Sequence, residues 1–356
     1  MGRRPAELRR QVDDEPLPQQ PGRVPRHRAP GYETTLANWN AADAIPWYLS
    51  DFGPASEYRG FRKGFQQVPF TLAERVKKAG GGIEFSKALR GFKVIDTGTG
   101  KLVELSFDDG PTVLAEKLVL AMPRRSLELV ARNSPLLCGQ VYELICSVTP
   151  RPLLKLFTTY DHPWWTAAGV QAGRSTTDLP VRQTYYWPQD DGRPVDATDR
   201  AMLMASFDDG LNIGFWDGFR PQRRRGGSQP DPKELFQPSE HLPRGSQWLK
   251  NPPPADMVQE VQRQLGVIHG LQFTPPVIDA CYKDWGEDPF GGAWNSWNIG
   301  VESASVRERI TKPLDDQPVY ICGEAYSDAQ GWVEGALQTA DRVLHKLHRV
   351  PPLIDG

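Results

Sequence analysis

The feature that most constrains the fold of this chain is its C-terminal stretch VYICGEAYSDAQGWVEGAL, residues 319–337. An apolar run predicts a buried strand, small and acidic residues then predict a loop, and a helix is expected to open at Gly331. Gly323 would let a ligand approach the backbone closely. The first N–H groups of a helix have no partner inside the helix, so they favour electron-rich groups. This order of elements is typical of a unit that binds a phosphate-bearing cofactor.

Composition leaves room for two domains and argues against several classes of function. The chain has 356 residues, of which 39% are hydrophobic, and a net charge of −2. That charge gives no general affinity for nucleic acid or anionic membranes, and no apolar run reaches the roughly 18–20 residues of a membrane span. No apolar stretch follows the N-terminal arginines, so we expect no secretion signal and a cytoplasmic location. The cysteines lack metal-ligand spacing, which predicts reduced thiols and no metal site: Cys138, Cys146, Cys281 and Cys322.

Strand and helix patterns occur twice, with a different kind of sequence between them. Apolar residues at helical spacing predict a helix at 67–81, and apolar runs predict strands within 82–123. An aromatic-rich region with further strand patterns and an amphipathic helix at 255–270 follows. We therefore expect a cofactor domain interrupted by a substrate domain.

The expected division has five segments and one insertion. A stretch rich in Arg, Pro and Gln is expected to be disordered or a linker, and a connecting or substrate-domain segment follows it. A first part of the cofactor domain, the substrate domain and the last part of the cofactor domain complete the chain. In chain order the segments are 1–30, 31–58, 59–125, 126–315 and 316–350, with a Pro/Gly/Arg-rich surface insertion near 220–247.

Five stretches resemble, in the same order, motifs of the flavin-containing amine oxidases, the family of monoamine, polyamine and L-amino-acid oxidases. The most specific is GEAYSDAQGWVEGAL, which resembles the family's C-terminal signature. The others are RGFRKGFQQVPFTLAERVKKAGGGIEFSKALRGF, AEKLVLAMPRRSL, LLKLFTTYDHPWW and DWGEDPFGGAWNSWNIG. The resemblance covers about residues 35–348 and is nearest to the bacterial L-amino-acid oxidases.

The resemblance implies a fold and a reaction. The fold is α/β plus α+β, with a partial FAD/NAD(P)-binding, Rossmann-like domain interleaved with a mixed-sheet, aromatic-rich substrate domain. The reaction is FAD-dependent oxidative deamination of an amine, most naturally an L-amino acid. It gives an imine that hydrolyses to a keto acid and ammonia, and O₂ is reduced to hydrogen peroxide.

The resemblance also implies which residues meet the cofactor. The backbone at Leu89 would touch the adenine, Trp285 would pack near the isoalloxazine, and Glu324 would accept hydrogen bonds from sugar hydroxyls. The flavin pyrimidine edge would lie at the start of the last helix. The residues expected there are Gly323, Gly331, Trp332 and Val333. Ala293 stands where monoamine oxidases carry the cysteine that tethers the flavin, so the FAD is expected to be non-covalent.

Three residues match catalytic positions of the family. Lys155 matches the lysine that holds a water against flavin N5, and its apolar neighbours disfavour the ammonium form. Trp294 and Trp332 match the two aromatic positions that flank the substrate amine and exclude water. An amino-acid substrate also needs a cation for its carboxylate. Arg182 is a candidate, and strand alternation is expected to place it on one face with Tyr186.

One family feature is missing from this sequence. No GxGxxG motif lies between a strand and a helix, although the family begins with such a unit. We expect a second polypeptide to carry that half, or the chain to be a processed or truncated product of a longer precursor, or the gene to be disrupted, with residues 1–30 as a non-native lead-in. Two alternatives stay open, a non-enzymatic or binding protein that retains the fold without flavin, and a related flavin monooxygenase or desaturase.

Overall fold

The computed structural model forms a mixed α/β fold with two compact units. It describes residues 38–51, 61, 64–187, 196, 198–219, 252–286 and 292–349. The segment expected to be disordered or a linker, 1–30, and the insertion expected near 220–247 lie outside these residues. Unit 1 holds the described residues of 52–86 and 154–284, and unit 2 holds those of 35–51, 87–153 and 285–356.

Unit 1 is built on a five-stranded sheet with the strand order β10-β6-β9-β8-β7. Strand β10 pairs antiparallel with β6, and β8 pairs antiparallel with both β7 and β9. The strands are β6 Leu153–Tyr160, β7 Gly173–Thr176, β8 Gln183–Tyr186, β9 Ala201–Asp209 and β10 Asp279–Asp284. Strands β6, β8 and β9 fall in stretches that the sequence predicts to be strand-like and aromatic, whereas no pattern predicted β7 or β10.

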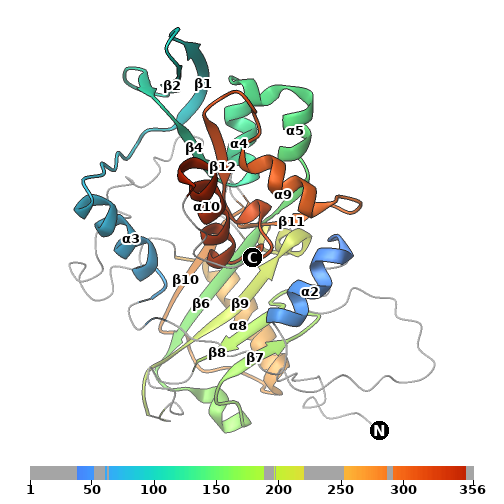
Figure 1. Cartoon of the computed structure of the whole chain (residues 1–356). Helices are drawn as coiled ribbons and strands as arrows, with labels where there is room; N and C mark the ends of the chain where they lie inside the picture. Colours follow the sequence, from blue (N-terminus) through green and yellow to red (C-terminus); the bar gives the residue numbers. More distant parts are fainter. Residues whose placement is uncertain are drawn as a thin grey trace. The chain divides into compact units, whose positions relative to one another are not determined.

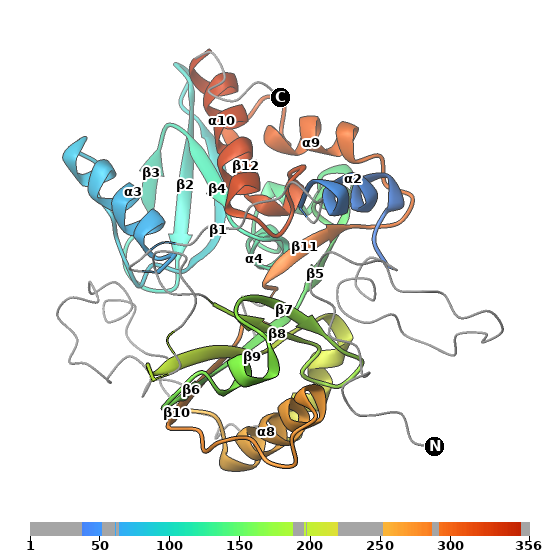
Figure 2. The same cartoon turned by 90° about the horizontal axis from the view of Figure 1, so that it is seen from below.

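The core of unit 1 lies between this sheet and helix α8 (Ala255–His269). The helix runs along the sheet in Figure 2 and buries Met257, Val261 and Leu265 against Leu154 and Leu156 of β6. Burial alternates along β6, because successive side chains of a strand point to opposite faces. The other face of β6 carries the partly exposed side chains, among them Lys155.

Unit 1 also includes helix α3 (Gln67–Lys78), which lies where the sequence predicts a helix. None of its side chains is buried. Three single-turn or shorter helices complete the unit: η3 Trp164–Ala168, η4 Gly210–Ile213 and α6 Gly214–Asp217.

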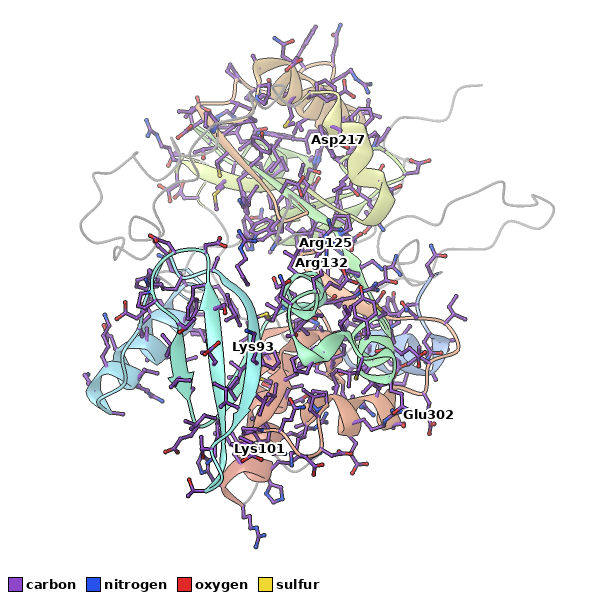
Figure 3. All side chains as sticks on the ribbon, turned by 90° about the horizontal axis from the view of Figure 1, so that it is seen from above. Lys93, Lys101, Arg125, Arg132, Asp217 and Glu302 are labelled. Atoms are coloured by element: carbon purple, nitrogen blue, oxygen red, sulfur yellow. The ribbon has the colours of Figure 1, made fainter. Side chains whose placement is uncertain are left out.

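Unit 2 begins its sheet structure with an antiparallel meander of β1 (Leu89–Asp96), β2 (Lys101–Phe107) and β3 (Val113–Ala115). Figure 3 labels Lys93 on β1 and Lys101 on β2. Lys101 Nζ donates a hydrogen bond of 2.7 Å to a backbone carbonyl oxygen at Asp316, which ties the meander to the chain just before the last strand.

The predicted C-terminal strand and helix are both present. Strand β12 (Val319–Cys322) pairs parallel with β4 (Leu118–Ala121), and helix α10 (Val333–His348) follows it. Tyr320 and Cys322 pack against Val343 of α10, which lies beside β12 in Figure 1. Two segments that are about 200 residues apart in the sequence thus form one small layer. Such a separation is compatible with parallel pairing, because two parallel strands need a crossover connection between them.

The remaining elements of unit 2 surround this layer. Strands β5 (Val148–Arg151) and β11 (Trp294–Trp297) pair antiparallel. The helices are α2 Ala41–Asp51, α4 Arg124–Ala131, α5 Gly139–Ile145 and α9 Ser303–Thr311, with short η2 Pro135–Leu137 and η7 Glu324–Tyr326. The contacts divide the chain at other positions than 125 and 315. The binding roles expected for a cofactor domain and a substrate domain remain predictions.

Candidate functional site

The residues predicted to form one site fall on both units, and each group is described within its own unit. Unit 1 contains Lys155, Arg182 and Tyr186. Unit 2 contains the predicted cofactor residues and both tryptophans, namely Leu89, Trp285, Trp294, Gly323, Glu324, Gly331, Trp332 and Val333.

The centre of the candidate site in unit 2 is the 323–332 loop, which joins β12 to α10. Near each end of this loop a glycine has a backbone conformation that other residues rarely adopt, with φ 138° at Gly323 and φ 85° at Gly331. A Cβ atom at position 323 would also lie 3.4 Å from the carbonyl oxygen of Met122. The glycines of the sequence motif are therefore explained by local geometry.

The carboxylate of Glu324 bridges the loop and strand β11. Its Oε1 accepts a 2.6 Å hydrogen bond from Asn295 Nδ2, and its Oε2 accepts a 2.8 Å hydrogen bond from the Gly331 backbone N–H. Burial raises the pKa of this carboxyl above its usual value, and the two hydrogen bonds act in the opposite direction. Glu324 therefore holds the start of α10 against β11, in addition to any contact with a sugar hydroxyl.

Gln330 is a second anchor of the 323–332 loop and is 1% exposed. Its Nε2 donates to the carbonyl oxygen of Ala325 at 2.6 Å, and its Oε1 accepts from the backbone N–H of Trp297 at 3.0 Å. Its own backbone carbonyl oxygen accepts a 2.9 Å hydrogen bond from the indole Nε1 of Trp47. Every polar group named here is thus satisfied within unit 2, which fixes the loop.

Three tryptophans pack together behind this loop. The rings of Trp47 and Trp294 are stacked, with 6.5 Å between centroids and a 5° interplanar angle. Trp39 lies 5.0 Å from the Trp47 ring and 5.4 Å from the Trp294 ring. All three side chains are buried. Gly331 lies against Trp294, because a Cβ there would be 3.7 Å from the ring.

Helix α10 begins next to this cluster with an open end. No side chain caps its N-terminus, and Trp332 and Val333 are each 40% exposed. Farther along the helix, Thr339 Oγ1 accepts a 2.9 Å hydrogen bond from Gly323 N–H. The N–H groups of Trp332 and Gly335 donate to the carbonyl oxygens of Ala329 and Trp332. In the described part of the chain, the N–H groups of Val333 and Glu334 remain available to an electron-rich group.

Two predicted cofactor contacts lie elsewhere in unit 2. Leu89 is the first residue of β1 and is half-buried, opposite Phe107 of β2. Trp285 is 41% exposed, and its backbone N–H donates to the carbonyl oxygen of Leu153. Both side chains are accessible enough to contact a ligand, and their roles stay predictions.

In unit 1, Lys155 lies on β6 among aromatic side chains. Its Nζ is 5.3 Å from the centroid of the Phe207 ring, a distance at which a cation is attracted to the ring face. Burial lowers the pKa of this lysine below its usual value. Phe157 and Trp187 stack nearby in the same unit at 6.2 Å. The apolar surroundings expected from the sequence are thus present around Lys155.

The geometric argument for Arg182 was wrong. Arg182 precedes β8 and has φ 58°, so strand alternation does not place it with Tyr186. It is buried, and its guanidinium forms ion pairs with Asp208, at 3.4 Å, and with Asp209. Tyr186 is buried as well. Its hydroxyl shares a 2.8 Å hydrogen bond with His269 Nε2 and donates to Ser175 Oγ at 3.1 Å. The substrate-binding roles of both residues stay untested predictions.

Sequence reasoning missed the residues that support the loop. Asn295 and Gln330 lie inside motifs but were not singled out, and Trp39 and Trp47 belong to no motif. The only signal was the high tryptophan content, 11 residues in the chain, which does not say which tryptophans meet. Within the described ranges, no cluster of His, Cys, Asp and Glu has the arrangement of a metal site. No helix in those ranges is long and apolar enough to cross a membrane.

Comparison with known families shows one match. The model of the flavin-containing amine oxidoreductases matches residues 29–343. Aplysianin-A of Aplysia kurodai is 26% identical over 344 residues, which is 89% of this chain and 57% of that protein. A putative L-amino-acid oxidase of Bacillus subtilis, YobN, is 22% identical over 198 residues, which is 55% of this chain and 33% of that protein.

A solved structure is similar as well. A double mutant of putrescine oxidase with redesigned cofactor binding matches with a TM-score of 0.55 and 14% sequence identity. The match covers 81% of this chain and 53% of that chain, and at this identity it shows the fold alone. The chain therefore spans about half, or less, of the length of the proteins compared here.

Proposed function

Because this chain belongs to the family of flavin-containing amine oxidoreductases, we propose that it serves in the FAD-dependent oxidation of an L-amino acid. The products would be a keto acid and ammonia, formed through the imine, and hydrogen peroxide from O₂. The family acts on CH–NH₂ groups, and several relatives are named L-amino-acid oxidases. These names support the class of reaction, and the choice of an L-amino acid as the substrate is our proposal.

The observation that carries the proposal is the 323–332 loop with the open N-terminus of α10. Two glycines with positive φ and the bridging carboxylate of Glu324 fix the backbone at this point. No side chain caps the helix, so the N–H groups of Val333 and Glu334 in its first turn have no partner among the described residues. Such a point favours an electron-rich ligand. The described residues therefore fit the pyrimidine edge of a flavin, with Trp332 and Val333 beside it.

The chain's own residues have separate tasks in this proposal. When bound, FAD supplies the hydride acceptor and passes the electrons to O₂. Lys155 would hold a water and move a proton, because its lowered pKa makes the neutral amine more accessible. Trp332, which is partly exposed, would exclude water from the substrate amine, while the buried Trp294 would support it from behind. Ala293 offers no thiol, so the cofactor would be held without a covalent bond.

We also propose that activity requires a dinucleotide-binding half, carried either by an N-terminal portion of a longer form of this chain or by a second polypeptide. The sequence contains no GxGxxG motif in a strand–helix context. The chain also covers only 57% of aplysianin-A and 53% of the putrescine oxidase chain. The missing half would bind the pyrophosphate and the adenosine ribose. We propose that this chain is located in the cytoplasm.

The test is a visible absorption spectrum of the chain after incubation with FAD and desalting. We expect no flavin band for the chain alone and a band when it is co-expressed with the polypeptide that carries the GxGxxG half. Bleaching by L-amino acids, with one peroxide released per imine, would then support an oxidase. An alkene or amide product would support a desaturase or monooxygenase instead. Absence of a band in both preparations would refute the flavin proposal and favour a non-enzymatic protein.

A further inference from the structure

Helix α2 has no part in the function proposed so far, yet it is firmly attached to unit 2. Asn40 N–H donates to the carbonyl oxygen of Trp297 at 3.0 Å, and Asn40 Nδ2 donates to that of Val301 at 3.0 Å. Ser303 Oγ donates to Asp43 Oδ1 at 2.5 Å. These hydrogen bonds join the start of α2 to residues more than 250 positions away in the sequence.

Helix α2 cannot owe its order to its own sequence. It has only 11 residues, and Pro46 lies inside it. Helices of this length are marginal in isolation, and an interior proline removes a backbone hydrogen bond and clashes with the preceding turn. The contacts with the rest of unit 2 must therefore stabilise it, and its buried side chains are those of Ala44 and Trp47, of which Trp47 is the larger.

Trp47 touches two different parts of the candidate site at once. Its ring stacks on Trp294 of β11, and its indole N–H donates a 2.9 Å hydrogen bond to the backbone carbonyl oxygen of Gln330. That carbonyl belongs to the peptide group whose N–H is that of Gly331, and the Gly331 N–H is bound to Glu324 Oε2. One peptide plane is thus held on its oxygen side by α2 and on its nitrogen side by Glu324.

We infer that Trp47 is a positioning residue, which fixes the Gln330–Gly331 peptide and so sets the orientation of the 323–332 loop and the start of α10. The description of this loop as a cofactor site rests on the proposed function, whereas the positioning itself does not. The competing explanation is that Trp47 only fills space beside Trp294, in which case its N–H is dispensable.

The chain offers a matched control for this distinction. Trp39 belongs to the same cluster, and it is buried to a similar degree, 3% exposed against 8% for Trp47. Among the described residues, its indole N–H has no hydrogen-bond partner. Trp47→Phe and Trp39→Phe therefore remove the same atoms from the same cluster, but only Trp47→Phe removes a hydrogen bond to the loop.

The first measurement is hydrogen–deuterium exchange of the full chain, without flavin, followed in peptides that cover residues 323–333. Loss of one hydrogen bond is expected to speed exchange at Gly331 and Trp332 about fivefold in Trp47→Phe. Exchange in this region should change less than twofold in Trp39→Phe. Peptides from β9 and α8 of unit 1 report whether the fold is otherwise intact.

Equal acceleration in both variants, or no acceleration in Trp47→Phe, would overturn the inference. If Trp47→Phe speeds exchange throughout the chain, the replacement of Trp47 by 3-benzothienylalanine decides the question. That side chain has the shape of tryptophan and a sulfur atom in place of the N–H. The inference requires faster exchange confined to 323–333, and unchanged exchange there refutes it.

A second measurement separates this inference from the proposed function. FAD is added to the chain co-expressed with the polypeptide that carries the GxGxxG half. The affinity for FAD is measured by flavin fluorescence for the wild type and both variants. We expect Trp47→Phe to weaken binding about fivefold and Trp39→Phe to leave it unchanged. If the wild type binds no flavin, the proposed function fails, and the exchange experiment still decides whether Trp47 positions the loop.

Discussion

Gly335 in the second half of the C-terminal motif should be intolerant of alanine, for a reason that the structure supplies. It lies in the first turn of α10 and is buried, without a positive φ. A Cβ atom there would clash with Ser327 Oγ and with the carbonyl oxygen of Ala329, and would lie 2.9 Å from Ser327 Cβ. The clash with Ala329 involves backbone, so it cannot be relieved by rotating a side chain.

The magnitude follows from three opposing effects. Alanine is better than glycine inside a helix by about 1 kcal/mol. Overpacking of a tight site costs about 2 kcal/mol, and displacement of Ser327 Oγ would break its 2.7 Å hydrogen bond to the Glu324 carbonyl oxygen, which costs about 1 kcal/mol. The net loss of unfolding free energy for Gly335→Ala is about 2 kcal/mol, or roughly 4–8 °C in Tm.

Gly139→Ala is the matched control. Gly139 is the first residue of α5 in the same unit, and no atom lies within 4 Å of an added Cβ. This variant should be as stable as the wild type or slightly more stable. Both are measured by thermal and urea unfolding followed by tryptophan fluorescence. The reasoning is refuted if Gly335→Ala proves as stable as Gly139→Ala, because the clash would then not exist.

Three further predictions concern unit 1. Arg182→Met should reduce the unfolding free energy by about 3–5 kcal/mol, because it leaves Asp208 and Asp209 buried without their cation. Urea unfolding measures this loss, and a raised KM with unchanged stability would instead support the substrate-binding role. Burial raises the pKa of Asp208 from 3.8 to about 7, so the folded state holds a proton that the unfolded state releases, and stability should fall as pH rises from about 4 to about 7. Asp208→Asn should flatten that slope in a pH series of urea titrations, and an unchanged slope would assign the proton to another group. Lys155→Met should leave Tm unchanged or raise it, because burial disfavours the ammonium form of the lysine. In a peroxide assay of the chain co-expressed with the GxGxxG half, the same change should lower kcat/KM about 100-fold. Full activity would remove Lys155 from the mechanism.

Local patterns were sufficient for the elements that carry the motif. The apolar run before Gly323 forms β12, and the helix after Gly331 begins at Val333. Both glycines have the positive φ that explains their presence. These features depend on residues close in the sequence, so local conformational preferences determine them.

Arg182 shows where such reasoning fails. A strand pattern suggested that its side chain alternates with that of Tyr186, but the backbone turns at φ 58° immediately before β8. The guanidinium therefore reaches Asp208 and Asp209 at the end of β9. The sequence stretch containing these aspartates carries no sign that they would be buried, because burial depends on the packing of neighbouring strands.

The sequence by itself determined the family signature, the strand–loop–helix order and the positions of the glycines that the loop requires. Only the tertiary structure decided what supports that loop. Trp47 and Gln330 are 283 positions apart, yet a single hydrogen bond joins them, and Asn295 of β11 donates to Glu324 after β12. Such pairings depend on the placement of whole elements in three dimensions, and no local pattern of residue types encodes that placement.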